Sequence, residues 1–259
     1  MNAGLYGLGL AAIGGLALIG WVIATARRNV SVVDSLWGLF FVVAMAVYCS
    51  RGTSTRGALV LALVGLWAVR LSAYVTWRNR GEAEDRRYRA IRATREPGFW
   101  WKSLYVVFGL QALLAWIISL PLHAAAVSTA PLGVPDALGI ALFLSGFAFE
   151  TIGDAQLARF KADPAHRGAV MDRGLWRYTR HPNYFGECCV WWGLYAIALG
   201  AGAWWSVPGP LLVTLLLLKV SGVTLLEKDI GERRPAYADY IARTPAFLPG
   251  RPRAPATKR

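Results

Sequence analysis

Cysteine and histidine are scarce in this chain, and acidic residues are few. Its 259 residues include three cysteines, three histidines and 15 Asp or Glu, against 28 Lys or Arg. Cys49, Cys188 and Cys189 have neither the spacing of a disulfide framework nor that of a metal site. We therefore expect no stapled secreted fold and no bound metal. The absence of any strand pattern or fixed-period repeat also argues against a β-rich protein or a solenoid.

Apolar sequence dominates instead, with 56% hydrophobic residues and a mean hydropathy of +0.40, above the range of soluble globular proteins. A helix needs about 20 mostly apolar residues to cross a bilayer. We predict an all-α membrane protein with seven transmembrane helices, at 4–26, 30–50, 57–77, 99–120, 137–154, 184–204 and 208–226. This predicts a single membrane domain over 1–249 and a disordered tail over 250–259. Helix starts are expected at Pro182, before the sixth span, and at Pro208 or Pro210, because proline suits the first helical turn. No basic region precedes the first helix, so we expect it to be retained and not cleaved as a signal.

The basic residues follow the predicted topology. Of the 28 Lys and Arg, 24 lie in the segments 27–28, 78–102, 159–180 and 228–259, which are alternate connections between spans. The positive-inside rule then places the N-terminus outside, the C-terminus in the cytoplasm, and all long polar loops on the cytoplasmic side. The net charge of +13 is thus explained by topology and lipid contact, and we expect no nucleic acid partner.

Ionisable residues inside the spans gather toward the predicted cytoplasmic half of the membrane. Such residues are costly in lipid and are candidates for function, although some only lock helices together. Isolated structural locks would be scattered through the bilayer, so the one-sided distribution predicts a water-accessible pocket that opens to the cytoplasm. The residues concerned are Asp34, Arg70, Glu150, Asp154, Glu187 and Lys219.

Two long loops beside this pocket mix arginines with acids. They are "WRNRGEAEDRRYRAIR" at 77–92 and the segment 153–187, which ends in "RYTRHPNYFGE". A surface that binds anionic lipid gains nothing from the interspersed carboxylates. A site that must orient its arginines does, because carboxylates hold guanidinium groups bidentately. Arginines held in this way suit phosphate.

Three motifs together resemble the bacterial branch of the steroid 5-alpha-reductase family, membrane enzymes that reduce a conjugated enone with NADPH. They are "NVSVVDSLWG", "GEAEDRRY" and "DRGLWRYTRHPNYFGE", and the resemblance extends from Val30 to Pro249. It implies a seven-helix reductase that uses NADPH as cofactor and acts on a 3-oxo-Δ4-steroid or a similar enone lipid that enters from the bilayer. It also implies an enzyme of the bacterial inner membrane with its cofactor site on the cytoplasmic side and no obligate protein partner.

The "RHPNYFGE" element also resembles isoprenylcysteine carboxyl methyltransferases and related phospholipid methyltransferases. These share the later pattern of Glu227, Tyr237, Tyr240 and Pro249. An S-adenosylmethionine-dependent lipid methyltransferase is therefore an alternative, and a non-enzymatic lipid-binding membrane protein is a second one. The motifs "VDSLWG" and "EDRRY" favour the reductase.

The resemblance assigns cofactor roles by position. Asn183 and Glu187, one helical turn apart, are implied to contact the nicotinamide-ribose end. Further matched positions are Asn79, Asp154, Lys161, Tyr178, Tyr237 and Tyr240. The remaining candidates, for the pyrophosphate, adenosine or 2′-phosphate, are Arg86, Arg87, Tyr88, Arg173, Arg180 and His181.

One departure concerns the proton donor for the enone oxygen. The animal enzymes carry a Gln-Glu-Leu-Pro-Ser run in the second span, and this chain has "VDSLWG" in a comparable place. Asp34 is a candidate if burial keeps it protonated, and Ser35 or a tyrosine from another helix is a further candidate donor. Asp34 could equally form an internal ion pair with Arg70. Trp37, Arg70 and Tyr184 are the predicted substrate-pocket residues.

Overall fold

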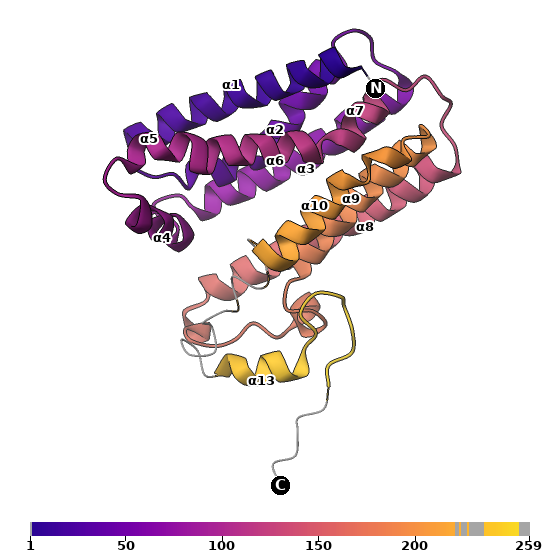
Figure 1. The fold of residues 1–259 in the computed structure, drawn as a ribbon. Helices are drawn as coiled ribbons and strands as arrows, with labels where there is room; N and C mark the ends of the chain where they lie inside the picture. Colours follow the sequence, from indigo (N-terminus) through magenta and orange to yellow (C-terminus); the bar gives the residue numbers. More distant parts are fainter. Residues whose placement is uncertain (1, 221–222, 224–226, 228–235, 254–259) are drawn as a thin grey trace. The chain divides into compact units, whose positions relative to one another are not determined.

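The computed structural model describes residues 2–220, 223, 227 and 236–253, and these are helical or irregular, with no strand among them (Figure 1). Four of the helices are long and apolar enough to cross a membrane, at Ala3–Arg27, Thr55–Arg78, Phe99–Ile118 and Val134–Ala162. This confirms the all-α class and the apolar, membrane-type character of the helices. The chain forms two compact units, described separately below, and the single domain over 1–249 stays a prediction.

Unit 1 comprises Met1–Val134 and Ile197–Gly209. In it, α1, α2 and α3 are neighbours that alternate in direction (Figure 1). Side-chain caps fix two of the starts: Asn2 accepts a hydrogen bond from the Leu5 amide and Ser54 one from the Gly57 amide, both at 3.0 Å. The elements are α1 (Ala3–Arg27), α2 (Val32–Tyr48), α3 (Thr55–Arg78), α4 (Arg86–Arg95), α5 (Phe99–Ser103), η1 (Leu104–Gly109), α6 (Leu110–Ile118), α7 (Leu120–Ala126) and η4 (Trp204–Ser206).

The predicted span 99–120 is not a regular helix throughout. A π-helical stretch, η1, separates α5 from α6, and α7 follows after Ser119. A π segment inserts wider turns into a helix and is frequent near functional sites. Sequence periodicity does not reveal it, because the apolar character of this segment continues through it.

A buried arginine, Arg56, holds together the connections at the end of unit 1 where α3 begins. Arg56, in the first turn of α3, is 1% exposed and donates to Ser128 and to the carbonyl oxygens of Ala130, Pro131 and Gly200 at 2.9 to 3.1 Å. These bonds satisfy backbone groups of a connection that has no regular structure of its own. Arg56 therefore has a structural role, because it holds these connections together. The charge pattern of the sequence does not predict this role.

Unit 2 comprises Pro135–Ala196 and Pro210–Arg259. The predicted helix starts at Pro182 and Pro208 are confirmed. The part of the predicted span 208–226 that follows Val220 lies largely outside the described residues. The elements are α8 (Val134–Ala162), η2 (Pro164–His166), η3 (Gly174–Arg177), α9 (Pro182–Gly200), α10 (Pro208–Leu215), η5 (Leu216–Val220) and α13 (Ala236–Arg243).

Glycines bring α8 and α9 into backbone contact. Buried Gly139, Gly146 and Gly153 recur every seven residues on α8, and Gly186 and Gly193 do so on α9. A Cβ on Gly186 would lie 2.5 Å from the Glu150 amide nitrogen, and one on Gly193 would lie 2.7 Å from the Gly139 carbonyl oxygen. Small residues at such spacing let membrane helices approach closely. The contact fixes the register of α9, which carries the "NYFGE" segment.

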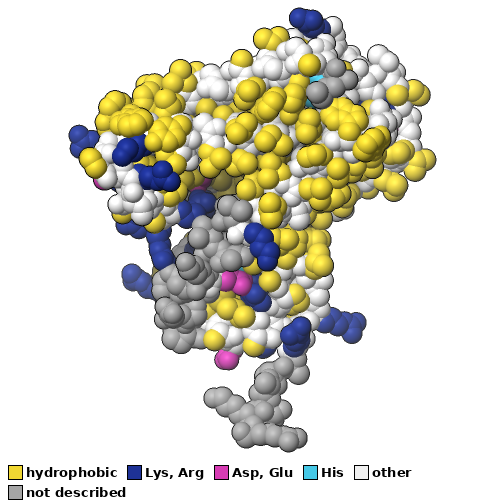
Figure 2. Space-filling view, in the orientation of Figure 1, with side chains coloured by type: hydrophobic (Ala, Val, Ile, Leu, Met, Phe, Trp, Pro, Cys, Tyr) yellow, Lys and Arg dark blue, Asp and Glu magenta, His cyan; other side chains and the backbone are white. Residues whose placement is uncertain are grey.

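The surface of unit 1 differs between the sides of its helices, which are apolar, and one of its ends, which is basic. In the view of Figure 2, hydrophobic side chains cover the helices, and Lys and Arg side chains gather at the end where α4 and α5 lie. α1 and α3 both finish at this end, with the exposed Arg27, Arg28 and Arg78. Apolar flanks with a basic end are typical of membrane-embedded helices.

Candidate functional site

The two motifs at Val30–Gly38 and Gly81–Tyr88 form one hydrogen-bonded site in unit 1. Asp34, in the first turn of α2, binds Arg87 Nη2 through Oδ2 at 2.7 Å and accepts a 2.5 Å hydrogen bond from Tyr88 Oη through Oδ1. The Asp85 amide donates to Ser31 Oγ at 2.8 Å. Gln111 on α6 donates from Nε2 to Tyr88 Oη at 3.1 Å. We call Ser31, Asp34, Asp85, Arg87, Tyr88 and Gln111 the Asp34 cluster.

Local sequence explains how α4 presents these groups. Asp85 caps α4 by accepting from the Arg87 amide at 2.8 Å, and it also holds Arg87 Nε at 3.0 Å. One carboxylate therefore starts the helix and orients the guanidinium that reaches Asp34. Tyr88, the next residue, is buried on the face of α4 turned toward the helices.

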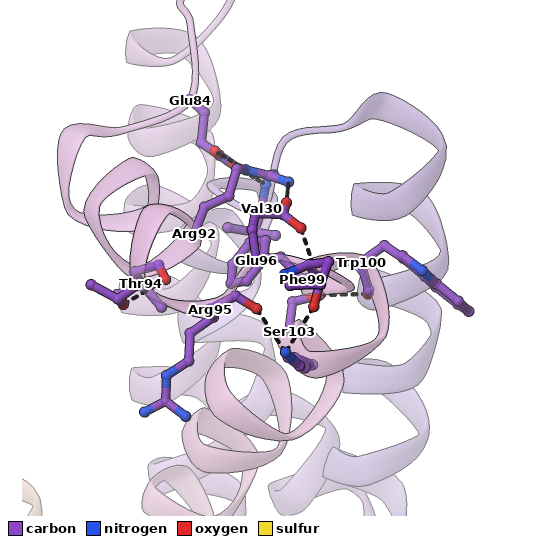
Figure 3. A network of polar contacts seen from close by, with 12 residues as sticks. Val30, Glu84, Arg92, Thr94, Arg95, Glu96, Phe99, Trp100 and Ser103 are labelled. Atoms are coloured by element: carbon purple, nitrogen blue, oxygen red, sulfur yellow. Dashed lines mark hydrogen bonds and ion pairs between the residues drawn. The ribbon is translucent and has the colours of Figure 1, made fainter.

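A second ion pair anchors α4 beside the cluster (Figure 3). Glu84 accepts from the Val30 amide at 2.9 Å and is held bidentately by Arg92, through Nε at 2.9 Å and Nη2 at 2.8 Å. The Arg92 guanidinium also lies 4.5 Å from the centre of the buried Phe99 ring. The Glu84–Arg92 pair thus joins the loop before α2 to both α4 and α5.

The charges of the cluster shift its pKa values in definite directions. Burial and the negative charge of Asp34 raise the pKa of Tyr88 well above its usual value, so the phenol keeps its proton at neutral pH. Burial alone would raise the pKa of Asp85, but the hydrogen bonds and charge of Arg87 lower it. The cluster therefore holds an ionised Asp85, a charged Arg87 and a protonated Tyr88.

The "RYTRH" segment in unit 2 is clamped to the C-terminal part of the chain. Arg180, 7% exposed, holds Glu227 bidentately at 2.7 Å through Nε and Nη2, and its Nη1 donates to the carbonyl oxygens of Ile241 and Thr244. His181 Nε2 lies 2.9 Å from Glu227 Oε1. We call Arg180, His181, Glu227 and these two carbonyls the Arg180 clamp.

Backbone pairing extends the clamp on both sides. The Arg180 amide donates to Pro245 and the Gly250 amide to Tyr178, both at 2.9 Å. Thr179 Oγ1 donates to the Phe247 carbonyl at 2.8 Å. Arg180 and His181, predicted as phosphate contacts, are therefore occupied by Glu227 and by backbone carbonyls. A phosphate would have to displace an existing bidentate pair to reach this guanidinium.

Glu227 is strongly acidic in this setting. Burial would raise the pKa of the carboxyl, but the hydrogen bonds from His181 and Arg180 and the charge of Arg180 lower it to about 2. Glu227 is consequently ionised throughout the physiological pH range, and the Arg180–Glu227 pair stabilises the folded state most where Glu227 is charged.

Asp154 and Asn183 meet where α8 and α9 cross. Asn183 Nδ2 donates to Asp154 Oδ1 at 3.2 Å, and the Asp154 side chain is buried. The other amide atom, Asn183 Oδ1, is buried and has no hydrogen-bond donor within the described part of the chain. Glu187 follows one turn later on α9 and is half-buried. A buried acceptor without a donor is unusual in a folded protein and is a candidate ligand contact.

The other predicted site residues lie as follows. Asn79 ends α3 and accepts from Arg78 Nε at 3.2 Å, and the Arg70 guanidinium lies 5.6 Å from the centre of the Tyr74 ring. The Tyr184 ring stacks on that of His181 with centroids 5.5 Å apart, and Tyr240 Oη donates to the Trp176 carbonyl. The half-buried residues are Ser35, Trp37 and Tyr237, and the exposed ones are Arg86, Lys161, Arg173 and Tyr178.

Four members of these clusters are absent from the predicted site residues, namely Ser31, Asp85, Gln111 and Glu227. Gln111 lies in an apolar segment and was not a candidate, although a single amide in a membrane-type helix is a usable signal. Glu227 was recognised only as part of a pattern shared with methyltransferases. Its role as the partner of Arg180 depends on a separation of 47 residues that no local pattern encodes.

Comparisons with known proteins give a family without an assigned activity. The family model described as "Protein of unknown function (DUF1295)" matches residues 20–244. An uncharacterized protein of Schizosaccharomyces pombe is 28% identical over 264 residues, covering 88% of this chain and 75% of that protein. No solved structure matches the chain.

Proposed function

The chain belongs to the DUF1295 family of proteins of unknown function, and we propose that it is an NADPH-dependent membrane reductase of a conjugated enone lipid. A 3-oxo-Δ4-steroid, reduced to the 5-alpha product, is the substrate implied by the resemblance. The observation that carries the proposal is the Asp34 cluster. It joins "VDSLWG" to "EDRRY", the two motifs that separate the reductases from the methyltransferases.

The cofactor assignment is supported by the chemistry of unit 2. NADPH, when bound, supplies hydride from its nicotinamide ring to the β-carbon of the enone. The nicotinamide carboxamide offers an N–H donor, and Asn183 Oδ1 is a buried acceptor that has no donor among the described residues. Asp154 orients this amide, because a carboxylate accepts hydrogen bonds and so faces Nδ2. The exposed Arg173 is the proposed phosphate contact, since the clamp occupies Arg180.

Tyr88 is proposed as the donor to the carbonyl oxygen of the enone. That oxygen gains negative charge when hydride is added to the β-carbon, and a hydrogen-bond donor must stabilise it. Tyr88 keeps its proton at neutral pH, and Gln111 holds its hydroxyl from the other side. When the Tyr88 hydroxyl donates to the enone oxygen in place of Asp34, Asp34 still has Arg87 as its ion-pair partner. Asp34 is then a positioning residue for Tyr88. Of the candidate donors, Asp34, Ser35 and a tyrosine from another helix, we thus propose the tyrosine.

The proposal includes the finer topology expected from the sequence. We propose seven spans, with the N-terminus outside and the cofactor site at the cytoplasmic side of the bacterial inner membrane. Support comes from the four apolar helices and from the basic end of unit 1, to which α4 and α5 belong.

A lipid methyltransferase that uses S-adenosylmethionine is the second candidate. The Arg180 clamp is compatible with it, because Arg180, His181 and Glu227 belong to the pattern that resembles both families. The Asp34 cluster has no part in that pattern, so the reductase is preferred.

One experiment separates the two candidates. The full-length protein in detergent is mixed with NADPH and progesterone, a 3-oxo-Δ4-steroid, and the loss of reduced-cofactor absorbance is followed together with product analysis. The reductase proposal expects stoichiometric NADPH oxidation and a saturated 3-oxo-steroid. No turnover with several enones, together with measurable S-adenosylmethionine binding, would overturn it in favour of the methyltransferase.

A further inference from the structure

Four of the five arginines of α4 fall into two groups that differ in their contacts. Arg87 and Arg92 are fixed on carboxylates of unit 1, as described above. Arg89 and Arg95 are exposed, and their guanidinium groups make no ion pair within the described part of the chain. Arg87 and Arg92 thus attach α4 to the rest of unit 1, whereas Arg89 and Arg95 are exposed on its surface.

The attachment determines which side of α4 faces away from the bundle. Tyr88 and Arg92 lie four residues apart on one face and bind Asp34, Glu84 and Phe99. At 100° per residue, the exposed alanines Ala90 and Ala93 lie on the other side and Arg89 lies on the flank next to them, whereas Arg95 follows Tyr88 by seven residues and is exposed because it lies in the last turn. The small side chains beside Arg89 leave the helix surface open for close approach of a flat anionic layer.

The α4 end of unit 1 carries most of the exposed cations of that unit. The predicted outer end has one exposed arginine, Arg51, because Arg56 is buried in its carbonyl site. The acids Glu84 and Asp85 are engaged with Arg92 and Arg87. The exposed cations at the α4 end, here called the basic rim, are Arg27, Arg28, Arg78, Arg80, Arg86, Arg89 and Arg95.

Exposed aromatic side chains accompany the basic rim. Trp77 is 63% exposed and Trp100 is 60% exposed, and Trp101 and Tyr105 are also exposed. Trp100 also accepts a hydrogen bond from Trp21 Nε1 through its carbonyl, at 2.8 Å, which fixes the start of α5 against α1. Exposed tryptophan and tyrosine are enriched at the level of the lipid headgroups. These aromatic residues therefore support a position of the rim at the depth of the headgroup phosphates.

We propose that the basic rim is a binding surface for the phosphodiester headgroups of anionic phospholipids, with Arg89 and Arg95 as its contacts on α4. The occupant is argued from charge complementarity and from the aromatic residues at headgroup depth. A basic residue near an anionic membrane surface favours binding about five-fold. This inference does not rest on the proposed reductase activity, because it concerns residues outside the Asp34 cluster and the Arg180 clamp.

The test measures lipid selectivity of the full-length protein reconstituted in phosphatidylcholine vesicles. Electron spin resonance with spin-labelled phosphatidylglycerol and, separately, spin-labelled phosphatidylcholine gives the relative association constant of the two lipids. We expect a preference for phosphatidylglycerol that the double variant Arg89→Gln/Arg95→Gln lowers at least five-fold. Arg89→Lys/Arg95→Lys should retain the preference, and so should Arg51→Gln, which removes the exposed arginine of the opposite end.

Three results would overturn the proposal. They are an unchanged preference in the double glutamine variant, an equal loss in Arg51→Gln, and a preference abolished by saturating NADPH, which would make the surface a nucleotide phosphate site. Raised salt should weaken the preference, since exposed charges are screened. Thermal unfolding of each variant shows that it is folded. Loss of reductase turnover with lipid selectivity intact would speak only against the proposed function.

Discussion

Tyr88 on α4 donates a 2.5 Å hydrogen bond to Asp34 on α2, across 54 residues of sequence. The bond brings a phenol that keeps its proton next to a carboxylate whose second oxygen is held by Arg87. A donor with a fixed position and a fixed proton is what reduction of an enone requires near the carbonyl oxygen.

Replacing Tyr88 by Phe should therefore lower kcat with an enone substrate by about 10²–10³-fold, the usual effect of removing one such donor. NADPH affinity should change little, because the cofactor contacts are assigned to unit 2. Steady-state turnover and NADPH titration measure the two effects. Tyr105→Phe, which alters an exposed tyrosine of the same unit, is the matched control and should keep turnover within about two-fold of the wild type.

Asp34→Asn tests whether Asp34, the acceptor of the Tyr88 hydrogen bond, positions the Tyr88 hydroxyl. The amide is similar in size to the carboxylate but no longer forms an ion pair with Arg87, so Tyr88 loses its fixed acceptor. Turnover should fall much more than cofactor affinity. Normal turnover in this variant would show that Asp34 is a structural ion-pair partner with no part in the reaction.

Asn183→Ala and Glu187→Ala should each weaken NADPH binding about ten-fold, while the thermal unfolding temperature changes little. For Asn183 the reason is that its Oδ1 has no donor among the described residues, so within them its removal breaks one hydrogen bond, the one to Asp154. For Glu187 the reason is its half-buried position one turn later on α9. Isothermal titration with NADPH provides the affinity. If both variants bind NADPH as the wild type does, the assignment of these residues to the cofactor is wrong.

The Arg180 clamp predicts a pH dependence of stability. The pKa of Glu227 is lowered from 4.5 to about 2 in the folded protein, so its stabilising contribution is complete above about pH 4.5 and is lost as the pH falls toward 2. The difference corresponds to about 3 kcal/mol of unfolding free energy. Thermal unfolding in detergent should show Glu227→Gln less stable than the wild type at pH 7, with the gap closing at acidic pH.

Glu82→Gln is the control for this effect, because Glu82 is exposed in the loop before α4. It should unfold with the pH profile of the wild type. A Glu227→Gln variant whose stability deficit is the same at pH 7 and at pH 3 would contradict an ionised clamp.

Backbone contact between α8 and α9 predicts that Gly186→Ala destabilises the protein by about 1–3 kcal/mol. The added methyl group would lie 2.5 Å from both the Glu150 amide nitrogen and the Gly146 carbonyl oxygen, which are backbone atoms and cannot rotate away. Gly65→Ala on α3 meets no atom within 4 Å and should be neutral or stabilising by up to about 1 kcal/mol. Thermal unfolding of both variants in the same detergent compares them, and equal behaviour would refute the close contact.

Local signals predicted much of the fold. The apolar runs gave the long helices, and Pro182 and Pro208 marked the starts of α9 and α10 because proline suits the first helical turn. The π-helical stretch at Leu104–Gly109 could not be predicted, since a change in backbone hydrogen bonding leaves no trace in an apolar pattern.

The candidate site was predicted less completely, because its partners are distant in sequence. Asp34 was singled out as an acid within a span, yet its link to Arg87 and Tyr88 requires the fold to bring α4 onto the start of α2. Arg180 is a predicted phosphate contact because of its charge and its place in the motif that resembles the reductase family. Its acceptors include backbone carbonyls of 241 and 244, and a carbonyl acceptor has no sequence signature.

The central claim is hydride transfer from NADPH to an enone, and isotope transfer measures it most directly. The protein is incubated with NADPH deuterated at both C4 positions of the nicotinamide and with progesterone, and the product is analysed by mass spectrometry and NMR. The account predicts a saturated 3-oxo-steroid with one deuterium at the former β-carbon, formed by the wild type and at least about 100-fold more slowly by Tyr88→Phe. A product without deuterium at that carbon, or no steroid product while S-adenosylmethionine is consumed with a lipid acceptor, would contradict it.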